Sequence, residues 1–141
     1  MAVLVDTNIL VYRFDGRDKG KQRIADDVLR RGVIDGSVRI SHQAVVEFVA
    51  ATTRVPPKAL PLLTPTEARQ EAEEFMAQFT VLYPNAALLR TALRGAAAYQ
   101  LSWFDAHMWA FAEHFGLSEI VSEDFQHGRL YGSVRARNPF L

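Results

Sequence analysis

The fold is decided by the stretch Ala2-Val3-Leu4-Val5-Asp6-Thr7-Asn8-Ile9-Leu10. A short apolar run ends at one carboxylate and two small polar residues, and apolar residues then resume. This pattern is typical of a buried parallel strand that ends at Asp6 and turns directly into a helix. Ligands of open α/β sheets bind beyond the carboxyl ends of the strands. We therefore interpret Asp6 as the first carboxylate of a divalent-metal site. This stretch alone leaves a helix N-cap equally open as its role.

The length and composition predict one soluble globular domain over residues 1–141. A chain of 141 residues has the common domain size, and its 49% hydrophobic and 23% charged residues exclude a disordered protein. The absence of cysteine excludes disulfides and thiolate metal sites and fits a reducing compartment. No apolar run approaches the roughly 18 residues of a membrane span, and Asp6 interrupts the apolar start that a signal peptide needs. We expect a cytoplasmic protein without a membrane segment.

The charges balance overall but are unevenly distributed. With 16 basic and 16 acidic residues the net charge is zero, which provides no global field for attracting nucleic acid. Seven basic residues nevertheless lie close together in the sequence: Arg13, Arg17, Lys19, Lys21, Arg23, Arg30 and Arg31. Arginine can bind phosphate through two parallel hydrogen bonds. The alternative is a solvated helix face on which neighbouring aspartates accompany these cations.

Strands alternate with helices along the chain. Strands are predicted at Val3–Val5, Val38–Ile40, Val81–Tyr83 and Ile120–Val121, with a last edge strand at Val134. A short helix is expected from Ile9 to Phe14, and another around Ile24–Leu29 that ends at Gly32 and Gly36. Further helices begin at Ser41, Thr64, Asn85 and Ser102 and run to about Thr53, Phe79, Tyr99 and Phe115. This alternation predicts an α/β fold: a three-layer α/β/α sandwich with a central, mostly parallel sheet.

Four carboxylates stand at positions where they can converge. Asp6 and Asp124 both follow short apolar strands, so a parallel sheet brings them to the same edge. Glu47 lies in the longest apolar stretch, where a charged side chain is costly to bury unless it is paired or coordinated. Asp105 opens an apolar helix, where it also completes a capping box with Ser102. Clustered carboxylates repel one another unless a cation compensates them.

Hard oxygen ligands of this kind suit Mg²⁺ or Mn²⁺. Such ions bound by carboxylates commonly hydrolyse phosphodiester bonds, because they activate a water molecule and stabilise the leaving oxygen. The sequence contains no phosphate-cradling glycine motif and no nucleophilic serine or cysteine with its partner residues. Metal-dependent phosphodiester hydrolysis is the chemistry that the residues favour.

The ordered set of motifs resembles the PIN domain, and within that family a VapC-type toxin of a toxin–antitoxin pair. The resemblance rests on Asp6-Thr7-Asn8, Glu47, Asp105, the segment Ser122-Glu123-Asp124-Phe125-Gln126-His127-Gly128 and the closing Asn138-Pro139-Phe140. It spans essentially the whole chain. Each motif is short, and the specificity lies in their order.

The resemblance implies an acidic quartet that binds Mg²⁺ or Mn²⁺, made of Asp6, Glu47, Asp105 and Asp124. It assigns supporting roles to Thr7, Asn8 and Ser122. The implied activity is metal-dependent endoribonuclease cleavage, often of transfer or ribosomal RNA. The implied partners are a cognate antitoxin that blocks the site and a second copy of the chain in a homodimer.

Several alternatives stay open. The same scaffold could cut DNA or mature RNA, or it could be an inactive PIN-fold interaction module. Glu123 adjoins Asp124, and we favour Asp124 as the ligand. His127 is the one histidine that we consider as an accessory group. The apolar, proline-rich segment Val55–Leu63 is proposed as a dimer or antitoxin contact.

Overall fold

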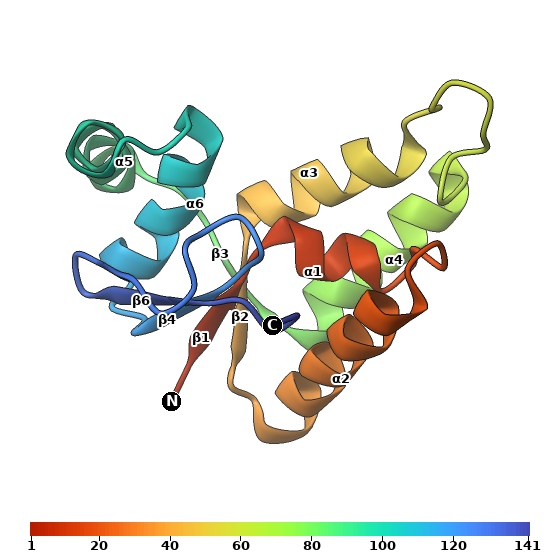
Figure 1. Ribbon diagram of the computed structural model, residues 1–141, viewed down its shortest axis with the longest axis horizontal. Helices are drawn as coiled ribbons and strands as arrows, with labels where there is room; N and C mark the ends of the chain where they lie inside the picture. The colour runs from red at the N-terminus through yellow and green to blue at the C-terminus, as the bar shows by residue number, and fades with distance from the viewer.

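The computed structural model describes residues 1–141 as one sheet with helices on both faces (Figure 1). The strands are β1 (Val3–Val5), β2 (Val38–Ser41), β3 (Thr80–Leu82), β4 (Glu119–Val121), β5 (Leu130–Tyr131) and β6 (Val134–Arg137). The helices are α1 (Thr7–Tyr12), α2 (Lys19–Asp35), α3 (His42–Thr53), α4 (Pro65–Gln78), α5 (Ala86–Tyr99) and α6 (Trp103–His114). The predicted α/β architecture is confirmed.

The sheet has six strands in the order β3-β2-β1-β4-β6-β5. Every neighbouring pair is parallel except β5 with β6. The prediction of an edge strand at Val134 is wrong, because β6 lies inside the sheet and β5 forms the edge. Sequence reasoning missed β5 because a strand of two residues is too short to carry a periodic pattern.

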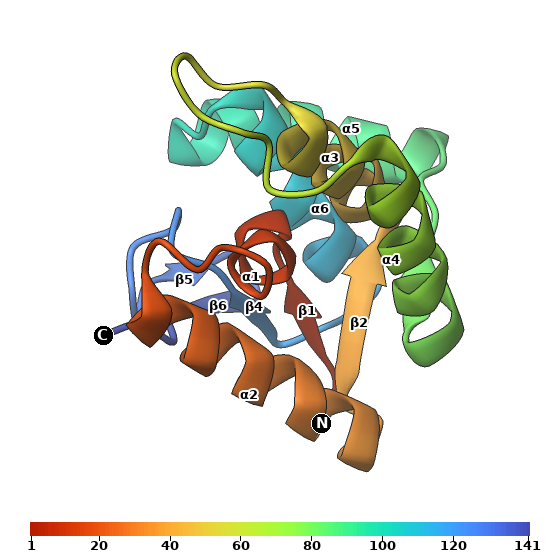
Figure 2. The ribbon, with the colours of Figure 1, turned by 90° about the vertical axis from the view of Figure 1, so that its right-hand side faces the viewer.

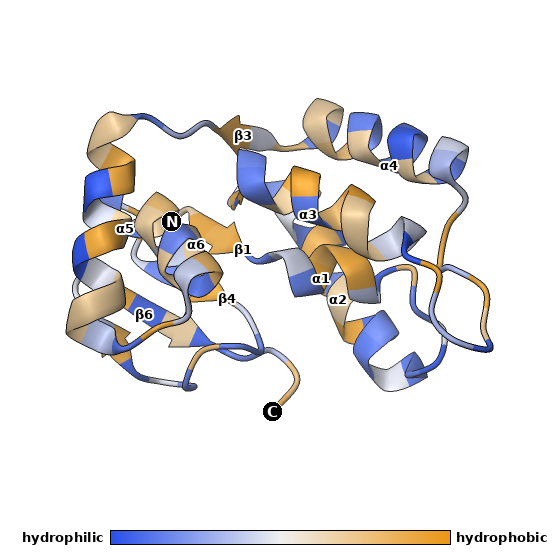
Figure 3. Cartoon of the chain, turned by 90° about the horizontal axis from the view of Figure 1, so that it is seen from above, coloured by the Kyte–Doolittle hydropathy of each residue, from blue (hydrophilic) through white to orange (hydrophobic).

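The helices form the two outer layers. Helices α5 and α6 pack together on one face, and α2 and α4 lie on the other, as the two perpendicular views show (Figures 1 and 2). A single cluster of 26 buried apolar residues fills the space around the sheet. Figure 3 shows β1 as hydrophobic and α4 as alternately hydrophilic and hydrophobic, the patterns of a buried strand and a surface helix. No helix is both long enough and apolar enough to cross a membrane.

Four predicted helix starts are confirmed by their capping hydrogen bonds, whereas the first helix, α1, begins at Thr7 and not at Ile9. Ser41, Asn85 and Ser102 each accept a hydrogen bond from a backbone N–H three residues along the chain, and Thr64 forms a complete capping box with Glu67. These bonds are local, so residue type and spacing are enough to predict them.

The prediction that Gly32 helps to end the second helix is wrong. Gly32 lies inside α2, which continues to Asp35 and ends at Gly36 with a φ of 67°. A Cβ atom at Gly32 would stand 2.2 Å from the side chain of Val38. The glycine is therefore required for the close approach of α2 to β2. Gly20 lies in the first turn of the same helix.

Candidate functional site

Asp6 stands where β1 ends and α1 begins, and it caps that helix, which is one of the two roles that its sequence position left open. Its Oδ1 accepts the backbone N–H of Thr7 at 2.7 Å, which caps α1. Its Oδ2 accepts the hydroxyl of Ser122 at 2.6 Å, from the end of the neighbouring strand β4. Helix capping occupies one carboxylate oxygen, and the other faces the residues that follow β4.

The Asp6 carboxylate is buried, with 4% of the residue exposed. The pKa of Asp6 is raised from 3.8 to about 7. Burial is the largest cause and the charges of Asp124 and Asp105 add to it, against the lowering effect of the hydrogen bonds from Ser122 and Thr7. The charged form is therefore unfavourable in the absence of a compensating cation. This is the electrostatic condition expected of a metal ligand.

Asn8 and Ser122 connect Asp6 to Asp124. The Asn8 amide nitrogen donates to Asp124 Oδ2 at 3.0 Å and to Ser122 Oγ at 3.2 Å, and Ser122 Oγ accepts the backbone N–H of Asp124. Desolvation raises the pKa of Asp124, and the charges of Asp105 and Glu123 add to this effect. The Asn8 amide oxygen is buried without a hydrogen-bond partner. Such an atom needs a ligand or a water molecule to satisfy it.

Glu47 reaches the same place from α3. Thr7 Oγ1 donates a hydrogen bond to Glu47 Oε1 at 2.8 Å. The half-buried carboxylate of Glu47 is therefore hydrogen-bonded within the chain. The amide of Gln43 lies 3.4 Å from Glu47 Oε2 and also donates to the backbone oxygen of Phe104. His107 contacts the Gln43 amide oxygen at 2.6 Å, and burial lowers the pKa of this histidine. Gln43 thereby ties α3 to α6 beside the site.

Asp105 is the least connected of the four predicted carboxylates. It lies half-buried in the first turn of α6, and its backbone N–H is capped by Ser102 Oγ at 3.2 Å. It influences Asp6 and Asp124 through its charge, but its side chain forms no hydrogen bond within the chain. The structure thus links Asp6, Thr7, Asn8, Glu47, Ser122 and Asp124 by hydrogen bonds, and Asp105 by electrostatics alone.

The four carboxylates do not form a closed metal cage. No three of the aspartate, glutamate and histidine side chains stand close enough together to be a preassembled ligand set. The donor types nevertheless fit Mg²⁺ or Mn²⁺, because Asp6 is a buried carboxylate that lacks a countercharge and the Asn8 amide oxygen lacks a partner. Mg²⁺ typically takes only one or two protein carboxylates and keeps several water molecules.

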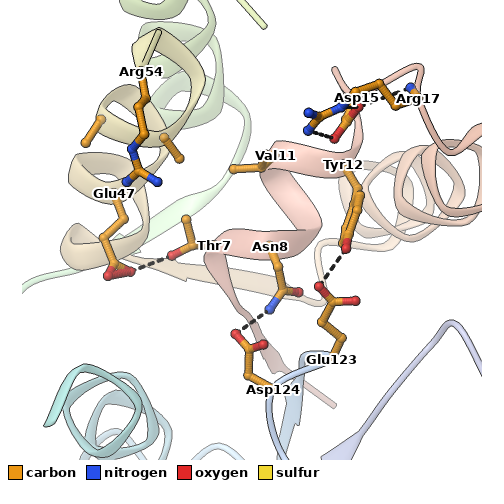
Figure 4. A pocket seen from close by; sticks show the side chains of 12 residues that line it. Thr7, Asn8, Val11, Tyr12, Asp15, Arg17, Glu47, Arg54, Glu123 and Asp124 are labelled. Carbon is orange, nitrogen blue, oxygen red and sulfur yellow. Dashed lines mark hydrogen bonds and ion pairs between the residues drawn. The ribbon is translucent and has the colours of Figure 1, made fainter. Parts of the chain in front are cut away.

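An open cleft of about 450 Å³ lies above this network, between α1, α3 and the segment after β4 (Figure 4). Its lining residues are Thr7, Asn8, Val11, Tyr12, Asp15, Arg17, Glu47, Ala50, Ala51, Arg54, Glu123 and Asp124. The lining therefore contains both negatively charged carboxylates and two positively charged arginines, Arg17 and Arg54. Asp105 does not line this cleft.

Glu123 binds side chains that lie outside the carboxylate network. Its Oε1 accepts the hydroxyl of Tyr12 at 2.7 Å, and its Oε2 pairs with Lys21 Nζ at 2.9 Å. This contact raises the pKa of Lys21. Phe140 packs edge-on against Tyr12, with the two ring centroids 5.2 Å apart. Glu123 therefore anchors the segment that carries Asp124 onto α1 and α2.

The contacts of His127 and of the early basic residues bear on the remaining predictions. His127 Nδ1 accepts the backbone N–H of Asn138, and His127 does not line the cleft. Of the seven early basic residues, five form ion pairs with acidic side chains: Arg13, Arg17, Lys21, Arg30 and Arg31. Pairing with neighbouring aspartates is confirmed for four of them, whereas Lys21 pairs with Glu123 from the far end of the sequence.

Sequence reasoning missed three residues of the site: Tyr12, Gln43 and Arg54. Tyr12 stands four residues after Asn8, so a helix places both on one face. Gln43 precedes Glu47 by the same interval, and Arg54 follows Glu47 by two helical turns. The signal in the sequence was their helical spacing from Asn8 and Glu47, which had already been singled out.

The sequence matches the family model of the PIN domain over residues 3–132. The chain belongs to the PIN-domain family. The match includes the whole carboxylate network from Asp6 to Asp124. The chain matches no curated protein sequence.

Solved structures share the fold of this PIN domain at low sequence identity. A DNA-bound VapBC from Salmonella typhimurium is 14% identical with a TM-score of 0.71, over 99% of this chain and 98% of that one. A toxin–antitoxin complex from Klebsiella pneumoniae is 19% identical with a TM-score of 0.67, over 98% of both chains. VapC20 of Mycobacterium tuberculosis, described as a Sarcin-Ricin loop cleaving toxin, is 16% identical with a TM-score of 0.62, over 84% of this chain and 87% of that one.

Proposed function

We propose that this PIN domain is a metal-dependent endoribonuclease, the toxin of a type II toxin–antitoxin pair. Membership of the PIN-domain family and the likeness to VapBC structures support this proposal. The observation that carries it is the buried Asp6 carboxylate, which faces the charges of Asp124 and Asp105 beside an unpartnered amide oxygen on Asn8. Buried carboxylates close to one another repel unless a cation or a proton neutralises them.

We assign the roles of the residues from their contacts. Asp6 and Asp124 would hold Mg²⁺ or Mn²⁺ most directly, with Glu47 and Asp105 acting from α3 and α6. Ser122 keeps the second oxygen of Asp6 directed toward the end of β4, and Thr7 keeps Glu47 beside it. When bound, the ion would acidify a water molecule and offset charge that develops on the scissile phosphate.

An RNA substrate in the transfer or ribosomal class is proposed from the resemblance to VapC-type toxins. One structural neighbour is described as cleaving the Sarcin-Ricin loop, which supports structured RNA as the substrate class. The open cleft is accessible to a polymer, since it lies on the surface between three segments. RNA as the target places the action of the protein in the cytoplasm.

A cognate antitoxin is proposed as the partner that blocks the site. The segment Val55–Leu63 remains our candidate contact, because Leu60 is 87% exposed and an exposed apolar side chain favours protein binding. This segment borders a hollow that shares Val11, Ala51 and Arg54 with the cleft. A peptide held there could therefore extend to the carboxylates.

A homodimer is the second proposed assembly. Helices α3, α5 and α6 expose apolar side chains, among them Val46, Leu93 and Phe104. A second copy of the chain would cover these side chains and remove their apolar surface from water. This face is a second candidate for the dimer contact, beside the segment Val55–Leu63.

The decisive experiment compares the wild type, Asp6→Asn and Asp27→Asn on RNA and on DNA of the same sequence, with Mn²⁺ and with EDTA. Asp27 is an exposed aspartate on α2 outside the cleft, so its substitution controls for the charge change. We expect Mn²⁺-dependent cleavage of RNA by the wild type and Asp27→Asn, and at least a hundredfold loss in Asp6→Asn. Calorimetry with Mn²⁺ measures binding independently of cleavage.

The other outcomes separate the alternative functions. Preferential cleavage of DNA would identify a DNA nuclease on the same scaffold. Absence of Mn²⁺ binding together with absence of cleavage would identify a non-catalytic interaction module. Full activity of Asp6→Asn would contradict the proposed site.

A further inference from the structure

Three of the six charged side chains that line the cleft are already in ion pairs within the chain. Asp15, which is 6% exposed, is held by Arg17 through Nε at 2.8 Å and Nη2 at 2.7 Å. The arginine lowers the pKa of Asp15 by these hydrogen bonds. Glu123 is paired with Lys21 in the same way. The remaining carboxylates of the cleft lining, Glu47 and Asp124, form no ion pair, and they connect to the buried Asp6 through Thr7 and Asn8.

Arg54 supplies an unpaired positive charge in the same cleft. It follows α3 directly in an extended conformation, lines the cleft wall and is exposed. Its guanidinium forms neither an ion pair nor a hydrogen bond within the chain, although its side chain points toward Glu47 in Figure 4. All of its donors are available to a ligand.

The surroundings keep this guanidinium accessible. The cleft lining also includes the short apolar side chains Val11, Ala50 and Ala51, which cannot pair with a cation. Arg17 stands in the same wall with 72% of its side chain exposed. Asp15 binds only two of its guanidinium nitrogens, and Nη1 forms no hydrogen bond within the chain.

We propose that Arg54, supported by Arg17, binds a backbone phosphate of the RNA strand next to the phosphate at the carboxylates. The proposal rests on the proposed function for the identity of the ligand as RNA. Phosphate carries the charge and the oxygen geometry that a planar guanidinium recognises with two parallel hydrogen bonds. The free cation lies in one cleft with Glu47 and Asp124 of the carboxylate network, so a single strand contacts both. Arg54 thus positions the strand and takes no part in the chemical step.

The test measures binding without cleavage and cleavage separately. The full-length wild type, Arg54→Ala, Arg54→Lys and Arg90→Ala are titrated into a fluorescent single-stranded oligouridylate in EDTA, and anisotropy is followed across salt concentrations. Arg90 is an exposed arginine of α5 outside the cleft, so its substitution removes the same charge elsewhere. Steady-state cleavage of bulk transfer RNA with Mn²⁺ is measured on the same four proteins.

We expect Arg54→Ala to raise the Kd for the oligouridylate roughly tenfold, because a charge-assisted contact to phosphate is lost. The slope of log Kd against log salt should fall by about 0.7, the value for one phosphate contact on a single strand. Arg54→Lys should keep the slope and weaken binding less, since it keeps the charge and loses the two-pronged geometry. In cleavage, KM should rise for Arg54→Ala while kcat stays within about twofold of the wild type.

An unchanged Kd and salt slope in Arg54→Ala would overturn the inference, and so would the same loss in Arg90→Ala. A fall in kcat with an unchanged KM would also overturn it, since Arg54 would then act on the chemical step. Wild type that binds oligouridylate through Arg54 but cleaves no RNA would leave the inference standing and refute the proposed function. The two failures are therefore distinguishable.

Discussion

At the scale of single residues, Asp6 shows how one side chain can serve structure and chemistry together. One oxygen caps α1, and the other is held by Ser122 in a buried position. Burial makes the charged carboxylate unfavourable, so the residue that helps to begin the helix also destabilises the metal-free protein at neutral pH. This cost is consistent with a site whose stable form contains a cation.

The stability of the metal-free protein should depend on the protonation of Asp6. Its folded pKa of about 7 lies above its ordinary value of 3.8, so its favourable contribution is complete below about pH 4 and is lost as the pH rises through 7. Three pKa units correspond to at most about 4 kcal/mol. Urea unfolding in EDTA between pH 4 and 8 should show a steeper fall for the wild type than for Asp6→Asn. Parallel curves for the two proteins would contradict the buried carboxylate.

Asp124 and Glu123 should differ sharply in their effect on Mn²⁺ binding. Asp124 is joined to Asp6 through Asn8 and Ser122, whereas Glu123 is paired with Lys21 and Tyr12. We expect Asp124→Asn to weaken Mn²⁺ binding by about tenfold to a hundredfold. Glu123→Gln should change it by less than about threefold, because a partly exposed ion pair contributes little. Calorimetry on both variants tests the assignment, and a larger loss in Glu123→Gln would reverse it.

At the scale of elements, the site depends on how closely the helices approach one another. Helix α6 carries Asp105, and its position is set by packing against α5. The closest approach is at Gly95, where a Cβ atom would stand 2.2 Å from the Trp109 ring. Gly95 therefore permits the α5–α6 contact that places Asp105 at the site.

Gly95→Ala should destabilise the protein although alanine is the better helix former. The added methyl group overpacks the contact with Trp109, and we expect a loss of about 1–3 kcal/mol in the free energy of unfolding. Gly20→Ala is the matched control, because its Cβ atom would meet Asp18 Oδ1 at an ordinary 3.5 Å. That variant should gain about 0.5 kcal/mol. Urea denaturation of both variants measures the difference, and equal stabilities would contradict the tight α5–α6 contact.

At the scale of the whole molecule, the exposed apolar side chains are unevenly distributed. Phe104 is 66% exposed on α6, and it lines one hollow together with the exposed Val46 of α3 and Leu89 of α5. The Val55–Leu63 segment exposes a separate set around Leu60. Two separate apolar surfaces suit two partners, a second copy of the chain and an antitoxin, as proposed above.

Phe104→Asp should convert the proposed homodimer to a monomer. In a two-fold symmetric dimer the substituted side chain occurs once in each chain. Both copies would bury an unpaired charge in the interface, which destabilises the dimer. Leu130→Asp, an exposed site of similar character on the edge strand β5, should leave the assembly unchanged. Sedimentation at several concentrations tests both variants. A wild type that stays monomeric would refute the dimer, and a dimeric Phe104→Asp would refute this face.

The sequence by itself determined the features that depend on neighbouring residues. Ser41, Asn85 and Ser102 cap helices through bonds to residues three positions away, and the apolar run before Asp6 is sufficient to predict β1. The parallel sheet followed from the alternation of strands with helices, and it brought Asp6 and Asp124 to one edge. Local hydrogen bonding and hydrophobic periodicity act over a few residues, so these features are legible in the chain.

Only the tertiary structure decided how distant side chains are paired. Glu123 is tied to Lys21 across 102 positions of sequence, Asn8 is tied to Asp124 across 116, and Arg54 is left without a partner in the cleft. The two-residue strand β5 and the position of β6 inside the sheet were likewise decided only by the tertiary structure. These outcomes depend on how helices and strands pack, and packing brings together residues that share no local pattern.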